Sequence, residues 1–110
     1  MSSKRNRTLG ARCRYRARLI READRIFADA KEARAHAEVA EQLNALWLQA
    51  GGLFKRAAKL YRSASLGLMA REAHKQAAYC FSLAGEEEEA ADCRQRAEII
   101  PPYCEEATDE

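Results

Sequence analysis

Apolar residues recur three and four positions apart along most of this chain, the spacing that places them on one face of an α-helix. Between positions 19 and 30 they are Leu19, Ile20, Ala23, Ile26, Phe27 and Ala30, and most of the positions between them are charged. Similar spacing runs through 37–50, 53–65, 69–84 and 86–99. We therefore predict a series of amphipathic helices and no strands.

Glycine and proline mark the predicted helix ends. They are the pair Gly51-Gly52, then Gly67, Gly85 and the pair Pro101-Pro102. A glycine at the end of a helix supplies left-handed backbone geometry, and a proline cannot continue a helix. We therefore expect a turn after Gly52 and four acidic residues, Glu86 to Glu89, in the first turn of the last helix, where the helix dipole favours negative charge.

A chain of 110 residues is long enough for one domain with a single modest core. Residues 1–10 are polar and basic and are predicted to form a flexible tail. Residues 11–102 form the predicted helical-repeat domain, and residues 103–110 form an acidic tail.

Two stretches of the chain repeat. Positions 19–30 (LIREADRIFADA) match positions 53–64 (LFKRAAKLYRSA), 34 residues later. The preceding segment repeats at a distance of 33, where Ala40, Ala45, Leu46, Leu48 and Gly52 match Ala73, Ala78, Tyr79, Phe81 and Gly85. Repeats of this length indicate a helical unit that buries its apolar face by stacking on its neighbour.

These positions resemble the tetratricopeptide repeat family. Ala23 with Phe27 and Ala57 with Tyr61 are similar to its Ala-x-x-x-aromatic step, and Pro102 is similar to its closing proline. The resemblance implies an all-α fold of antiparallel helical hairpins, stacked as a short repeat. It also implies a non-enzymatic adaptor that binds another protein or a peptide on the concave face. That face would carry Gln42, Leu46, Gln49, Lys75, Tyr79 and Ser82.

A second architecture is compatible with the pattern. No glycine or proline interrupts positions 11–50, so this segment is also compatible with one continuous helix. Its alanine-rich heptad seam would consist of Leu19, Ala23, Ile26, Ala30, Ala33, Ala37 and Ala40. Such a seam favours a homodimer.

A narrower resemblance covers positions 52–80. This segment is similar to small bacterial regulators of the ANR and PerC type at Gly52, Phe54, Ala57, Ala58, Tyr61, Tyr79 and Cys80. The resemblance implies control of transcription through contact with a regulator protein.

Charge is distributed unevenly. The net charge is only +2, but positions 1–21 hold eight Lys or Arg and no acid, whereas positions 86–110 hold ten acids and two Arg. The basic arm comprises Arg12, Arg14, Tyr15, Arg16, Arg18 and Arg21. A basic arm of this kind is typical of a segment that binds an acidic protein or nucleic acid. On nucleic acid, Tyr15 would stack on a base. The alternative function is therefore a small transcriptional regulator.

Candidate catalytic chemistry is sparse. The two histidines, His36 and His74, are 38 positions apart and have no evident partner for acid–base or nucleophilic catalysis. The four cysteines form no Cys-x-x-Cys pair and no export signal accompanies them, so we expect reduced thiols, with Cys80 and Cys93 in the core. We predict no enzyme activity, no cofactor and no metal site.

No apolar run approaches the length of about 18 residues that a membrane span needs. The N-terminus is charged and lacks the apolar core of a secretory signal. We therefore predict a cytoplasmic protein without a membrane partner.

Overall fold

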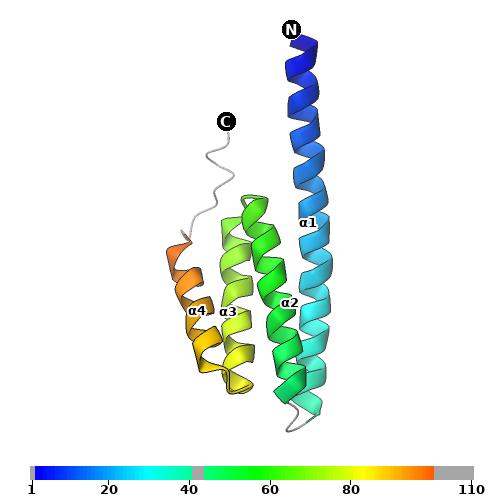
Figure 1. The fold of residues 1–110 in the computed structure, drawn as a ribbon. Helices are drawn as coiled ribbons and strands as arrows, with labels where there is room; N and C mark the ends of the chain where they lie inside the picture. Colours follow the sequence, from blue (N-terminus) through cyan, green and yellow to red (C-terminus); the bar gives the residue numbers. More distant parts are fainter. Residues whose placement is uncertain (1, 41–43, 101–110) are drawn as a thin grey trace.

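A computed structural model describes residues 2–40 and 44–100 and contains four α-helices in that part of the chain (Figure 1). They are α1 (Ser2–Val39), α2 (Asn44–Ser63), α3 (Gly67–Leu83) and α4 (Glu87–Ile99). Consecutive helices run antiparallel, and each packs against the next one along the chain. The described residues include no strand, so the predicted all-α fold of stacked antiparallel helices is confirmed.

The four helices alternate between two faces of the array. Arg34 of α1 reaches past α2 to hydrogen-bond with Gln76 of α3. On the opposite face Lys55 of α2 reaches Glu89 of α4, with 3.0 Å between the ammonium nitrogen and the carboxylate oxygen. Helices α1 and α3 therefore share one face, and α2 and α4 share the other.

The turns after α2 and α3 have the same construction. The Leu66 N–H donates to the Tyr61 carbonyl at 2.9 Å, and the Glu86 N–H donates to the Phe81 carbonyl at the same distance. Between these partners Ser65 and Gly85 take positive φ values of 63° and 83°. This pattern satisfies the last carbonyls of each helix.

The predicted role of Gly85 as a helix end is confirmed, but the prediction for Gly67 is wrong. Gly67 is the first residue of α3, and the left-handed position at the end of α2 belongs to Ser65. A short polar side chain tolerates this geometry better than a bulky or β-branched one.

The turn predicted at Gly51-Gly52 is also wrong, because α2 continues through both residues to Ser63. Gly51 is buried, and a Cβ atom added to it would lie 3.1 Å from ring atoms of Phe81 on α3. The glycine therefore serves the close approach of an aromatic ring to a helix backbone. The helix predicted over 37–50 is divided between two helices, since Ala37 belongs to α1 and residues 44–50 form the first part of α2.

Helix α1 is continuous from Ser2 to Val39, so residues 2–10 of the expected flexible tail are helical. The alternative of one continuous helix over positions 11–50 is therefore right as far as Val39. The chain bends at Ala40 before α2, and the predicted seam contributes Ala23, Ile26, Ala30 and Ala37 to the core of one chain. Gln42, the closing prolines, Cys104 and the acidic tail lie outside the described residues.

Buried small residues recur every 20 positions in the last three helices. They are Ala50, Ala70 and Ala90, and then Ala57, Ala77 and Ala97, each at most 2% exposed. Small side chains allow helix axes to approach closely. The interval equals the length of α3 with the short connection that follows it, from Gly67 to Glu86.

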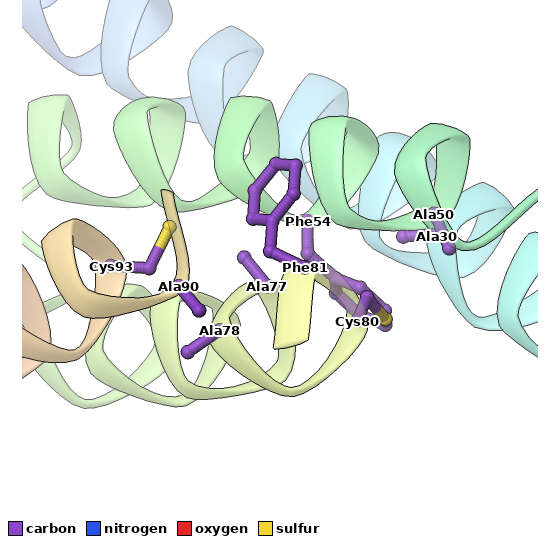
Figure 2. Close-up of a cluster of buried hydrophobic side chains, with 9 residues drawn as sticks. All are labelled: Ala30, Ala50, Phe54, Ala77, Ala78, Cys80, Phe81, Ala90 and Cys93. Carbon is purple, nitrogen blue, oxygen red and sulfur yellow. The ribbon is translucent and has the colours of Figure 1, made fainter. Parts of the chain in front are cut away.

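The core consists of these alanines and a few larger side chains. Figure 2 shows one cluster, with residues from all four helices: Ala30, Ala50, Phe54, Ala77, Ala78, Cys80, Phe81, Ala90 and Cys93. The burial of Cys80 and Cys93 confirms their predicted place in the core. Phe27 of α1 joins the cluster by edge contacts with Phe54 and Tyr61, at centroid distances of 5.4 and 6.0 Å.

We predict that Gly52→Ala stabilises the fold by about 0.5–1 kcal/mol, because alanine is the better helix former and the added Cβ meets no atom within 4 Å apart from those of the adjoining helix backbone. Gly85→Ala should destabilise it by about 1–2 kcal/mol, since Gly85 holds a positive φ. Urea unfolding followed by circular dichroism measures both. Destabilisation by Gly52→Ala would show that α2 does not continue through this position.

Candidate functional site

Tyr79 is a large aromatic side chain on the surface of α3, 47% exposed and yet fixed from two other helices. The guanidinium carbon of Arg34 on α1 lies 4.5 Å from the centroid of its ring. Trp47 of α2 meets the same ring edge-on, with a centroid distance of 6.1 Å and an interplanar angle of 84°. Cation–π and edge contacts of this kind hold the ring in one orientation.

Arg34 is itself held in place by polar contacts. Its guanidinium donates to the side-chain oxygen of Gln76, and its Nε lies 3.5 Å from the Glu38 carboxylate. The amide nitrogen of Gln76 in turn donates to the Glu72 carboxylate at 2.9 Å. This chain of contacts joins α1 to α3 beside Tyr79, so the exposed ring belongs to a preorganised surface.

A groove of about 600 Å³ lies between α1 and α3. Its lining consists of Phe27, Lys31, Arg34, Ala35, Glu38, Met69, Glu72 and Gln76. The charges of this α1–α3 groove balance, with two cations and two carboxylates. The ammonium of Lys31 lies 5.2 Å from the centroid of the Phe27 ring.

A second groove, of about 390 Å³, lies between α3 and α4. Its lining consists of Arg71, Lys75, Ala78, Tyr79, Arg94, Ala97 and Glu98. The buried alanines give this α3–α4 groove an apolar floor, and three cations against one carboxylate give it a positive rim. The Nε atom of Arg71 is buried and has no hydrogen-bond partner in the part of the chain that the structure describes.

The structure brings together two of the residues predicted to form the partner-binding face. Lys75 and Tyr79 line the α3–α4 groove, and Ser82 lies at the end of α3, with its hydroxyl 3.5 Å from the Glu87 carboxylate. Leu46 and Gln49 belong to α2 and are not part of the lining of either groove.

The sequence analysis missed Arg34, Trp47 and Arg94 as neighbours of this surface. They lie on three different helices, and nothing in their local pattern indicates that they meet α3. Only the packing of α1, α2 and α4 in the array brings these three residues to the surface of α3.

The basic arm forms part of α1. Arg16 points toward the array, where its Nε donates to the Ala64 carbonyl at 2.7 Å, at the C-terminal end of α2. A cation is favourable there because the last carbonyls of a helix carry partial negative charge. The other members, Arg12, Arg14, Tyr15, Arg18 and Arg21, are exposed.

The thiols of the core are poor nucleophiles. Burial raises the pKa of Cys80 to about 11, and burial also raises the pKa of Cys93, so both remain protonated at neutral pH. Across residues 2–40 and 44–100, no group of three or more His, Cys, Asp or Glu lies in position to hold a metal ion. Of the four glutamates predicted for the first turn of α4, Glu87, Glu88 and Glu89 occupy it, and Glu86 is the capping residue that precedes the helix.

His74 lies in α3 and is only 5% exposed, with its Nδ1 atom buried and without a hydrogen-bond partner in the described chain. Burial lowers the pKa of this imidazole, and the nearby cations Arg96 and Lys55 lower it further, against an opposing effect of Asp92. The neutral form of His74 is therefore the one that fits the fold. His36, the other histidine, is exposed.

No protein-family model matches this chain, and searches of curated proteins and of solved structures find no match either. Within the described residues, none of the helices combines the length and apolar character needed to cross a membrane.

We predict that the free energy of unfolding decreases as the pH falls from about 6.5 toward the lowered pKa of His74. In this window the unfolded chain binds more protons than the folded chain, so acid favours unfolding. His74→Leu should reduce this dependence, and His36→Gln should leave it in place. Urea unfolding between about pH 7 and 5 measures the effect; an unchanged slope in His74→Leu would assign it to other groups.

Proposed function

We propose that this chain is a non-enzymatic protein–protein interaction module, an adaptor that binds a segment of another protein along the exposed side of α3. The observation that carries the proposal is Tyr79, an aromatic ring that is exposed and yet held by Arg34 and Trp47. Residues that dominate binding energy are often Tyr, Trp and Arg. A fixed ring also loses little conformational entropy on binding.

The two grooves beside α3 support this assignment. Each has a partly apolar lining, with Phe27 and Met69 in the α1–α3 groove and Ala78 and Ala97 in the α3–α4 groove. A peptide lying along α3 would bury apolar side chains in these grooves on either side of Tyr79. Two residues predicted for the partner-binding face, Lys75 and Tyr79, lie on α3 and line the α3–α4 groove.

The charge of the α3–α4 groove indicates the chemistry of the segment. Arg71, Lys75 and Arg94 face only one carboxylate, that of Glu98, within this groove. The buried Nε of Arg71 is a hydrogen-bond donor without an acceptor in the described residues, and such donors favour a ligand that supplies one. The preferred segment therefore combines an apolar anchor with Asp or Glu residues.

Selection from a random peptide library displayed on phage, with the full chain as bait, tests the proposal. We expect selected peptides to be rich in acidic residues beside a large apolar residue. Tyr79→Ala should weaken their binding by about 2 kcal/mol, or roughly thirtyfold, as measured by fluorescence polarisation. The loss reflects removal of the fixed aromatic anchor.

Tyr15→Ala is the matched control, because Tyr15 is a comparably exposed tyrosine on α1 outside both grooves. Its affinity for the selected peptides should equal that of the unchanged chain. Equal binding by the Tyr79→Ala variant would place the peptide site elsewhere on the molecule.

A further inference from the structure

The N-terminal part of α1 projects beyond the rest of the helical array (Figure 1). The contact between Arg16 and the Ala64 carbonyl places Arg16 at the level where α2 ends. The helical residues that precede Arg16 therefore extend past α2, and more of the helix circumference is open there than in the packed part of α1.

Four exposed arginines lie in and next to this projection: Arg12, Arg14, Arg18 and Arg21. None of them forms a hydrogen bond or an ion pair within the part of the chain that the structure describes. Elsewhere Arg25, Arg34, Lys55 and Arg96 form ion pairs. Arg56, Arg62 and Arg94 lack one as well among the described residues, but they are spread over α2 and α4, whereas the four arginines of α1 lie within ten positions.

Three of these arginines form a strip along one side of the helix. Arg14, Arg18 and Arg21 are spaced four and three positions apart, which places them on one side of α1 over about 10 Å of its length. The buried residues Ala23 and Ile26 lie on the opposite side. Positions 1–21 contain no acid, so no carboxylate of this segment neutralises the strip.

The acidic residues that follow the strip on α1 have partners of their own, since Glu22 pairs with Arg25 and Asp24 accepts a hydrogen bond from the Tyr61 hydroxyl. Exposed Lys59 and Arg62 lie near the C-terminal end of α2, at the same end of the array as the projection. Glu86 to Glu89 lie at the opposite end, where α4 begins. A small net charge therefore conceals a basic end and an acidic end.

We propose that the basic strip of α1 binds the phosphates of duplex DNA. Arginine forms paired, charge-assisted hydrogen bonds with phosphate oxygens, and the major groove of B-DNA admits an α-helix. The deep and narrow major groove of duplex RNA does not admit side chains in this way. This interaction does not involve the proposed peptide site on α3. It depends on the charge of the phosphates and is independent of base sequence.

Fluorescence anisotropy of the full chain with a labelled duplex of random sequence, over a series of salt concentrations, tests the proposal. The three arginines of the strip predict a slope of roughly −2.7 for log affinity against log salt, so a fourfold rise in salt lowers affinity about fortyfold. Arg14→Gln, Arg18→Gln and Arg21→Gln together should weaken binding at low salt at least about tenfold and remove most of the slope. Glutamine preserves helix propensity, and far-UV circular dichroism verifies the helix content.

The matched control combines Lys55→Gln, Arg56→Gln and Arg96→Gln, three cations of α2 and α4 that lie outside both grooves. It changes the net charge by the same amount, and its DNA affinity should stay within about twofold of the unchanged chain if contacts are local. Equal losses in both triple variants, or no salt-dependent binding at all, would overturn the proposal. If polyglutamate binds with the same affinity and the same salt dependence as DNA, the proposal is also overturned, because the strip would then be a site for an acidic protein.

Discussion

Close packing between helix backbones is the constraint on which the rest of this structure depends. Alanines at intervals of 20 residues line the contacts between α2, α3 and α4, and Gly51 lets the Phe81 ring lie against the backbone of α2. Alanine buries little apolar surface, so each contact contributes through the short distance between helices and the dispersion that this distance allows. The larger buried side chains, such as Phe54 and Tyr61, are few, and they fill the spaces that the small residues leave between helices.

The same packing produces the candidate site. Because consecutive helices alternate between two faces, α1 and α3 lie on one face with α2 behind them, and side chains of α1 can contact α3. Arg34 and Trp47 come from different helices, and their separate contacts with Tyr79 require both interfaces to be formed. The orientation of the exposed ring is therefore a consequence of tertiary structure and is lost with it. The surface acts as one rigid unit, which suits recognition more than induced fit.

Local sequence signals predicted the helices whose ends are determined by residues at or next to the end itself. The predicted segments 69–84 and 86–99 agree closely with α3 and α4, because apolar periodicity and Gly85 act within a few residues. Gly51-Gly52 misled the analysis because glycine serves both helix ends and close backbone contacts, and only Phe81, 30 residues later, distinguishes the two. Tyr79 and Lys75 were found on their own helix, whereas Arg34 and Arg94 required knowledge of which helices are neighbours. The sequence repeats of 33 and 34 residues do not coincide with the interval of 20 that relates the buried alanines.

The antiparallel topology separates basic and acidic residues in space, which the small net charge does not reveal. The N-terminus of α1 and the C-terminus of α2 share one end of the array, and basic residues of both helices meet there, whereas the acidic first turn of α4 lies at the other end. Glutamates at a helix N-terminus and Arg16 at the end of α2 both complement helix dipoles, so part of this polarity stabilises the fold. Arg14, Arg18 and Arg21 have no such structural role, since they contact no acidic or polar partner among the described residues. Mutual repulsion of closely spaced like charges destabilises a helix. The strip therefore carries a cost to the folded chain that an external anionic partner would offset.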